Sequence, residues 1–557
     1  MHSHAQDHLE ENEEMPTSED EARPITRSII KRTLAGQDNA KTQAVISELV
    51  KTRRGLNQRH IQMIALAGTI GTGLFLATGK SLARGGPLSM LLAYCIVGML
   101  ICCVVFSVAE LSALAPLSGG IIRHAEWFVD PALAFAQGWN SVYANAILLP
   151  AEMVACAVII DFWSDINHAV WISALGALLV ISNMLLVSIY GELEFVFAML
   201  KIALIVGVNI LSICITSGAG PQGYPMGFKF WRDPGPFVQF LGIDGSWGRF
   251  LGFWRVLSSA AYAFSNVENI SVAAAETQNP RHNIPKAAKR VFWRILIFYL
   301  ITIFMMGLIV PSNDKGLMSN SGDAGASPFA IAATNVGIKA VPSIINAVVV
   351  TSAWSAANSA MLVGTRTLYG LAQEGHAPKL FTRINRFGVP WISVAAVGSF
   401  LALGYMTLSS TASIVFDWLQ QLVSAASLVH WINIEVIYLR FFYGCKKQKI
   451  SRTELPWKSP FQPYAAWIAL VSFSIILFTG GFYIFIDGNW SPQTFISSYF
   501  NIPLIFVLYF GYKFWRKTRL VPLEEIPIHE FLQIANENPE PIPSPPTGWK
   551  RLNVLWA

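Results

Sequence analysis

An uncharged run from Ile61 to Gly79 constrains this chain more than any other stretch, because it approaches the length of a membrane span while interrupting its own helix. A transmembrane helix takes roughly 20 apolar residues. This run carries Gly68, Gly71 and Gly73, and each glycine weakens a helix by about 1 kcal/mol relative to alanine. Two interpretations stay open. The glycines allow close helix packing, Gly68 and Thr72 forming a small-residue pair, or a ligand completes the hydrogen bonds of the freed amides.

The composition is that of a polytopic membrane protein. Of 557 residues, 53% are hydrophobic and only 13% are charged, whereas globular proteins carry about 25% charged residues. No basic block suited to nucleic acid, no nucleophile–base set and no Cys/His metal spacing occurs in the sequence. We therefore expect neither an enzyme nor a nucleic-acid-binding protein, and no bound cofactor or metal.

Apolar windows predict an all-α chain with about twelve membrane spans. The predicted spans are 61–79, 87–109, 133–160, 169–187, 195–216, 253–275, 295–311, 341–371, 391–408, 414–439, 464–486 and 495–512. The uncharged run from Gly388 to Phe416 is too long for one span, and Thr407–Thr411 is the predicted turn within it.

The distribution of charge predicts that both termini lie in the cytosol. Basic residues gather in the connections that follow even-numbered spans, such as 281–290 and 446–452, while the other connections carry aspartates and fewer basic residues. Basic loops stay on the cytosolic side. We therefore predict a disordered cytosolic tail at 1–56, a transmembrane domain at 57–515 and a cytosolic tail at 516–557.

Three charged residues lie within predicted spans, where a charge is costly and usually functional. Glu152 lies in span three, Lys201 in span five and Glu268 in span six. Each has a structural alternative. Glu152 could be a hydrogen-bonded structural carboxyl, Lys201 could extend to the interface along its aliphatic stem, and Glu268 could mark the end of a helical half.

Span six is the most polar span, with Ser265, Asn266, Glu268, Asn269 and Ser271. A glycine-interrupted first span and a polar sixth span lie five spans apart. This spacing is typical of an inverted repeat of spans one to five and six to ten, with the binding site between two broken helices. Asn358 in span eight and Trp418 in span ten are further candidates to line a cavity, or to contact neighbouring helices.

Several motifs follow one another in a specific order: Gly68–Phe75, Leu149–Glu152, Tyr190–Phe195, Ala274–Pro280 and Ser355–Ser359. Over nearly all of residues 56–515 the chain resembles fungal amino acid permeases of the yeast amino acid transporter family, in the amino acid–polyamine–organocation superfamily. The resemblance implies a LeuT-type fold with twelve transmembrane helices in a 5+5 inverted repeat. It also implies proton symport of amino acids into the cell across the plasma membrane.

The resemblance also implies roles for individual residues. The substrate carboxylate would bind amides of Thr69, Ile70, Gly71, Thr72 and Gly73, and the amino group would bind carbonyls near Ala65 and Phe264. Glu152 and Lys201 match positions tied to proton coupling and to replacement of a sodium ion. The remaining candidates for substrate binding are Ser265, Asn266, Glu268, Asn358 and Trp418.

One residue departs from the family pattern. The family usually shows Phe-x-Gly-x-Glu in span six, and here Asn266 stands in place of the glycine. A side chain at this position should narrow the substrate pocket or make it more polar, so the substrate class is left open.

Two other functions stay open: a non-transporting amino acid sensor on the same fold, and an exchanger of another amine or zwitterionic solute. The expected partners are the amino acid substrate, the proton, the lipid bilayer and ubiquitin-ligase adaptors acting on the cytosolic tails.

Overall fold

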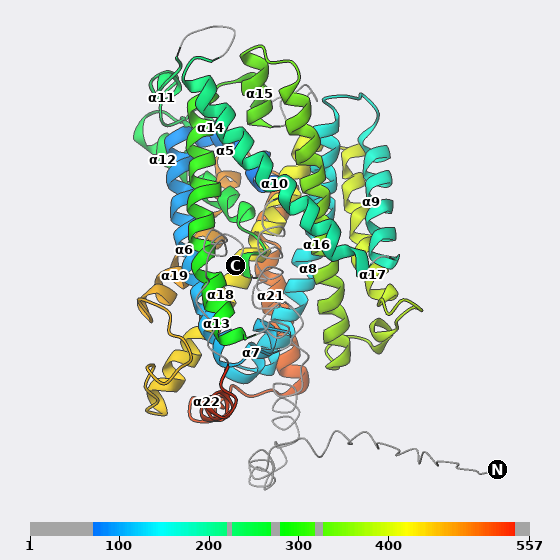
Figure 1. Ribbon diagram of the computed structural model, residues 1–557, viewed down its shortest axis with the longest axis vertical. Coiled ribbons are helices and arrows are strands. Elements are labelled where there is room, and N and C mark those ends of the chain that lie inside the picture. The colour runs from blue at the N-terminus through cyan, green and yellow to red at the C-terminus, as the bar shows by residue number, and fades with distance from the viewer. Residues whose placement is uncertain are drawn as a thin grey trace, which may run out of the picture. The chain divides into compact units, whose positions relative to one another are not determined.

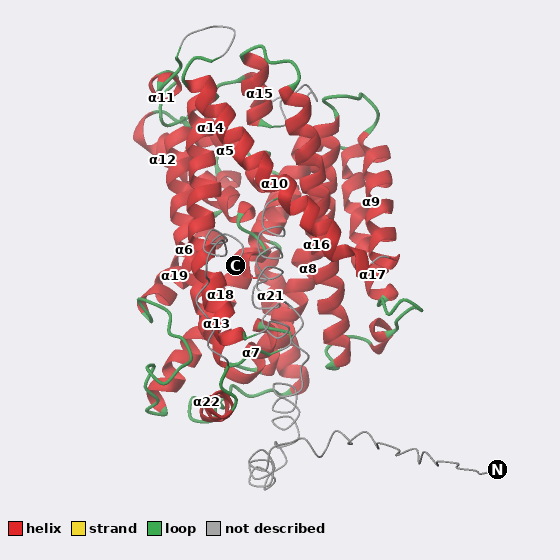
Figure 2. Cartoon of the chain, viewed as in Figure 1, coloured by secondary structure: helices red, strands yellow, loops and turns green. Residues whose placement is uncertain are grey.

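A computed structural model describes residues 71–117, 119–185, 187–219, 225–268, 279–317 and 327–540. Within these ranges every regular element is a helix (Figure 2), which confirms the predicted all-α class. The predicted N-terminal tail, 1–56, lies outside the described residues.

Helices or helix pairs coincide with all of the predicted spans. In chain order they are α4 (Thr72–Phe75) with α5 (Ala77–Gly85), α6 (Pro87–Leu114), α8 (Pro131–Ile160), α9 (His168–Leu185), α10 (Val187–Thr216), α12 (Gly245–Ala263), α13 (Pro280–Arg294) with the π-helical η3 (Ile295–Leu300) and α14 (Ile301–Ile309), α16 (Val341–Gln373), α17 (Trp391–Gly398) with η6 (Ser399–Leu408), α18 (Ala412–Lys447), α19 (Tyr464–Thr479) with η7 (Phe482–Phe485), and α20 (Pro492–Tyr499) with α21 (Asn501–Arg516). The predicted turn at Thr407–Thr411 is confirmed, because η6 ends at Leu408 and α18 begins at Ala412.

Short helices occupy the connections. These are α7 (Ile121–Phe128), α11 (Lys229–Arg232), η1 (Phe240–Gly242), η4 (Lys315–Leu317), α15 (Pro328–Asn335), η5 (Lys379–Thr382) and α22 (Ile528–Glu537). Among the membrane helices, α11 and α15 lie at one end, and α7 and α22 lie at the other (Figure 1).

Length and composition separate the continuous spans from the interrupted ones. Among the described residues, eight helices are long and apolar enough to cross a membrane, or nine if the bent pair α20–α21 counts as one span. Span four is represented by a shorter apolar helix, His168–Met184. Spans one and six do not pass this test. The described part of span one is the short pair α4–α5, and α12 stops at Ala263.

The spans differ in how much protein surrounds them. In α18 and α8, 83% and 78% of the apolar window is buried within the protein, whereas in α10 and α19 the share is 33%. Helix α8 packs against both α16 and α18. These three helices form the interior, so polar side chains on α8 face other helices rather than lipid.

The first part of the C-terminal tail packs on the membrane helices. The Val521 amide donates to the Val129 carbonyl, and Gln448 donates to carbonyls of Leu523 and Ile526. Helix α22 buries Ile528, Phe531, Leu532, Ile534 and Ala535. Helix α21 ends at Arg516, and the described residues beyond it are folded against the same unit.

Both interrupted spans show non-helical backbone at the predicted places. Gly71 has φ −125° and ψ −149°, so α4 starts only at Thr72. At span six the helix ends at Ala263, and Asn266 has φ +67°, in the left-handed region. Glycine adopts this conformation freely, and asparagine tolerates it better than most other residues. This backbone conformation explains why a position that suits glycine can hold Asn266.

Candidate functional site

Glu152 lies where the interrupted spans one and six meet span three. The Thr72 amide opens α4 and has no partner within its own helix, as is usual for the first amides of a helix; it donates to Glu152 Oε2 at 3.4 Å. The Tyr262 hydroxyl on α12 donates to Glu152 Oε1 at 3.0 Å and lies 3.1 Å from Thr72 Oγ1. Glu152 is 2% exposed, so its carboxyl is shut off from solvent by these partners.

The two described glycines of the first motif, Gly71 and Gly73, allow neighbouring groups to approach the backbone of α4 closely. A Cβ atom on Gly71 would lie 2.9 Å from Glu152 Oε1, and a Cβ atom on Gly73 would lie 2.6 Å from the Ala263 Cα atom. These contacts support the packing interpretation for this part of the motif. They also show that the protein's own carboxylate takes the Thr72 amide that we expected a solute to take. Ala65, Gly68, Thr69 and Ile70 lie outside the described residues.

Lys201 does not extend to the membrane interface, so that alternative is wrong. Its side chain is 1% exposed within the protein and lies within electrostatic range of Glu194 and Glu152. Glu194 precedes Lys201 by seven residues on α10, which is two helical turns on the same face. Glu194 accepts hydrogen bonds from Ser355 Oγ at 3.1 Å and from Ser359 Oγ at 3.0 Å.

Glu194 and Tyr262 were not among the predicted site residues. A carboxylate two turns before Lys201, facing two serines four residues apart on span eight, was the pattern that could have identified Glu194. No comparable pattern marks Tyr262, because its role depends on the end of α12 lying beside α4.

The backbone groups at the end of α12 are satisfied by neighbouring side chains. The Tyr299 hydroxyl donates to the Ala263 carbonyl at 3.1 Å, and Ser265 Oγ donates to the Tyr262 carbonyl. The Phe264 ring lies against Tyr299, with ring centroids 4.7 Å apart. Phe264 and Ser265 therefore hold the interruption of span six in shape, next to the Glu152 cluster.

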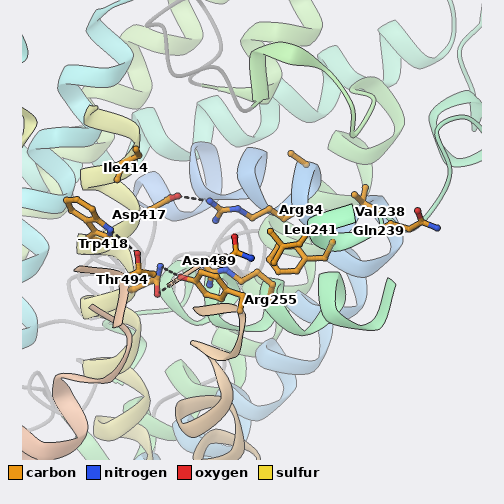
Figure 3. A pocket seen from close by; sticks show the side chains of 14 residues that line it. Arg84, Val238, Gln239, Leu241, Arg255, Ile414, Asp417, Trp418, Asn489 and Thr494 are labelled. Atoms are coloured by element: carbon orange, nitrogen blue, oxygen red, sulfur yellow. Dashed lines mark hydrogen bonds and ion pairs between the residues drawn. The ribbon is translucent and has the colours of Figure 1, made fainter. Parts of the chain in front are cut away.

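The other predicted residues lie elsewhere. Glu268 accepts from the Trp431 indole N–H at 3.0 Å and lies 4.0 Å from His430 Nε2, both on α18. Asn358 accepts from the Asn183 amide at 2.6 Å and joins α16 to α9. Trp418 donates to Thr494 Oγ1 at 3.3 Å and lines a separate cavity (Figure 3). The structure thus groups Gly71, Thr72 and Gly73 with Glu152, and separates Trp418 from them.

Comparison with known proteins identifies the class. The profile of the amino acid permease family matches residues 60–524. The chain is 36% identical over 496 residues to the proline-specific permease of Emericella nidulans, covering 87% of this chain and 89% of the relative. It is 35% identical to the dicarboxylic amino acid permease of Saccharomyces cerevisiae, covering 88% and 82%. It is 36% identical to the lysine-specific permease of the same yeast, covering 88% and 81%.

The chain belongs to the amino acid permease family, a family of membrane transporters rather than enzymes. It is a multi-pass membrane protein. These three relatives are named for different amino acids at nearly equal identity. Overall similarity therefore does not decide which amino acid this chain carries.

The fold is shared with a distant solved structure. The crystal structure of the Eremococcus coleocola manganese transporter, in complex with an aromatic bis-isothiourea substituted compound, matches with a TM-score of 0.53 at 12% identity and covers 85% of this chain and 95% of that chain. Together with the family match, this confirms the predicted LeuT-type fold.

Proposed function

We propose that this protein imports amino acids together with a proton across the plasma membrane by alternating access, with both termini in the cytosol. One observation carries the proposal. Glu152 is a buried carboxyl that, among the described residues, accepts hydrogen bonds from two neutral groups, the Thr72 amide and the Tyr262 hydroxyl. A buried carboxyl without a fixed salt-bridge partner is suited to gaining and losing a proton as its surroundings change.

The contacts of Glu152 join the parts that would move. Glu152 belongs to span three, whereas Thr72 and Tyr262 belong to the interrupted spans one and six. In our mechanism spans one and six rock against spans three, four, eight and nine. A carboxylate only accepts hydrogen bonds, while a protonated carboxyl also donates one. Protonation would therefore change the bonds between the two bodies.

The charge balance around Lys201 supports the same step. Counting the described residues alone, ionised Glu152, Glu194 and Lys201 sum to −1, whereas with Glu152 protonated the charges of Glu194 and Lys201 cancel. Burying net charge is costly. Lys201 supplies at this place the positive charge that a bound cation would supply, and neutralisation of Glu152 completes the balance.

Substrate binding would couple to this proton through Thr72. The proposed carboxylate site comprises the amides of Thr69, Ile70, Gly71, Thr72 and Gly73, and the proposed amino-group site comprises carbonyls near Ala65 and Phe264. Ser265, Asn266 and Glu268 would shape the side-chain end. A substrate carboxylate and Glu152 compete for the Thr72 amide, and a protonated Glu152 is the weaker acceptor. Protonation would therefore free this amide for the substrate.

Radiolabelled uptake in a permease-deficient yeast host tests the proposal, with the twenty standard amino acids as competitors. We expect accumulation of at least one amino acid that collapses when the pH gradient is dissipated. Glu152→Gln should lose accumulation and keep exchange. Glu530→Gln, on the exposed surface of α22, is the matched control and should behave as wild type. Binding without uptake would favour a sensor, and pH-independent exchange would favour an exchanger.

Localisation belongs to the same proposal. A tagged full-length protein should reach the plasma membrane, and ubiquitin-ligase adaptors acting on lysines of the cytosolic tails should control its removal. Retention of the tagged protein in an internal membrane would contradict this part.

A further inference from the structure

A cavity of about 420 Å³ lies beside the cluster at Glu152 but is distinct from it. It is enclosed by α5, α12 and α18, by the segment 238–241, and by residues of the segment 483–494. Figure 3 shows polar side chains that line it, which include Arg84, Arg255, Asp417, Trp418, Asn489 and Thr494.

Positive charge exceeds negative charge in this cavity. Asp417 already accepts from Arg84 Nη2 at 2.6 Å and from Lys80 Nζ at 2.8 Å. Arg255 is 4% exposed and its guanidinium lies 4.4 Å from the centroid of the Tyr483 ring. Among the described residues no hydrogen bond or ion pair reaches the Arg255 guanidinium. Arg84 and Lys80 therefore share one carboxylate, and the lining of the cavity carries two guanidinium groups, Arg84 and Arg255, against the single carboxylate of Asp417.

The Arg255 guanidinium lines the cavity and has no anionic partner among the described residues, so an anion that enters the cavity can pair with it. Arginine presents a planar set of donors that matches a carboxylate. Trp418, Gln421 and Asn489 add an indole face and amide groups around the same space. The chemistry of the walls fits a small solute that carries a carboxylate.

The cavity lies next to the Glu152 cluster with an aromatic side chain in between. Arg255 and Tyr262 are seven residues apart on α12, which puts them on one face and about 10 Å apart along the helix. The Phe416 ring lies 6.0 Å from the Tyr262 ring, and Lys80 Nζ lies 5.2 Å from the centroid of the Phe416 ring. Phe416 thus contacts both Tyr262, of the Glu152 cluster, and Lys80, which pairs with Asp417 of the cavity wall.

We propose that this cavity is a second binding site, in which Arg255 takes the carboxylate of an anionic solute. The net positive charge favours amino acids with two carboxylates, and simple dicarboxylates, over neutral amino acids. If the termini are cytosolic as proposed above, the cavity faces the exterior and holds the solute before it reaches Glu152. The binding itself does not depend on that orientation or on transport.

Calorimetry on purified full-length protein in nanodiscs tests the site with two ligands, L-glutamate and glutarate. Glutarate has the same carboxylates but no amino group. We expect Arg255→Gln to raise Kd at least tenfold, on the order of 1.4 kcal/mol. Arg249→Gln, an exposed position on the same helix, should leave Kd unchanged. Binding of glutamate alone would identify the transported amino acid as the source of the carboxylate. Binding of both ligands would identify any dicarboxylate.

A second variant distinguishes a loss of binding from a loss of folding in Arg255→Gln. Gln239 lies exposed at the wall of the cavity, so Gln239→Glu adds a carboxylate there without disturbing a buried side chain. The Gln239→Glu variant should also bind both ligands more weakly than wild type. The Arg255→Lys variant should retain most of the affinity. The proposed site would be overturned by any of three results. The Kd could be the same in wild type, Arg255→Gln and Gln239→Glu. Wild type could bind neither ligand, or chloride could displace the bound ligand equally well. If wild type binds the ligands in an Arg255-dependent way but takes up no amino acid, the proposed transport is contradicted and the binding site is not.

Discussion

Two buried glutamates in this protein have opposite surroundings. Glu110, near the end of α6, forms a salt bridge with Arg452 at 2.8 Å and also accepts from Tyr438 and from the amide and hydroxyl of Ser459. Glu152 is equally enclosed, and within the described part of the chain its hydrogen-bond donors are the Thr72 amide and the Tyr262 hydroxyl, both neutral. Burial alone therefore does not mark a functional carboxyl; the charge of its hydrogen-bond donors separates the two cases.

The difference also concerns what each glutamate connects. Glu110 ties α6 to α18 and to the segment that follows α18, and its charge is balanced in place. Glu152 connects span three to the two interrupted spans. We interpret Glu110 as a structural anchor and Glu152 as a group that changes its proton and its partners.

The largest expected effect separates the anchor from the coupling group. Glu110→Gln leaves Arg452 without its carboxylate, and breaking a buried ion pair costs about 3–5 kcal/mol. We expect a large loss of thermal stability and of folded protein by size-exclusion chromatography. Glu152→Gln is the matched variant and should stay close to wild type in both measurements. Equal stability losses in the two variants would contradict the assignment of Glu110 as a structural anchor and Glu152 as a group that exchanges its proton.

Substitutions at the glycines beside Glu152 should give the second-largest loss of stability. Gly73→Ala pushes a methyl group against the backbone of Ala263 and should cost about 1–3 kcal/mol of stability. Gly71→Ala instead meets the carboxyl end of the Glu152 side chain at 2.9 Å and the Ala356 Cβ atom at 3.2 Å, and no backbone atom as closely. It should leave melting temperature nearly unchanged and reduce uptake. A stable and fully active Gly73→Ala variant would show that α4 and α12 do not pack as described.

Asn266 gives a smaller effect. Glycine relieves the left-handed backbone at φ +67°, and the left-handed region costs other residues roughly 1–2 kcal/mol. Asn266→Gly should therefore raise stability by up to about 1 kcal/mol and broaden the amino acids that compete for uptake. Asn266→Ala should lower stability. Unchanged selectivity in the glycine variant would separate Asn266 from the substrate pocket.

The smallest effect comes from an acid at the protein surface. Asp161 lies 2.7 Å from His168 Nε2 in the connection after α8, and this hydrogen bond raises the pKa of His168 above its ordinary value near 6.5. The pair therefore stabilises the fold below about pH 6.5 and loses this contribution as pH rises through the raised pKa. Asp161→Asn should lower stability by less than about 1 kcal/mol at pH 5.5 and leave it unchanged at pH 9. A loss that is the same at both pH values would show that His168 is not the group involved.

Part of this architecture follows from the sequence. The positions of the spans, the interruption at Gly71 and the enclosed Glu152 follow from apolar length, glycine content and the cost of charge in a membrane. The partner of the Thr72 amide does not, because Glu152 is 80 residues away and meets it only after three spans pack together.

The sequence does not predict the cavity at Arg255 either. Arg255 is a charged residue near the start of predicted span six, yet it was not predicted as a site residue. Trp418, a predicted substrate-binding residue, lines the same cavity as Arg255. Which side chains meet in one cavity depends on how deep each lies along its helix and on which neighbouring helix it faces. The residue pattern of a single helix gives neither.

Proton movement in proteoliposomes tests the central claim most directly. With a pH-sensitive dye inside the vesicles, adding a transported amino acid outside should acidify the lumen for wild type. Glu152→Gln should show no acidification while still exchanging labelled for unlabelled amino acid. Acidification of equal size in Glu152→Gln, or wild-type uptake without any proton movement, would contradict the account.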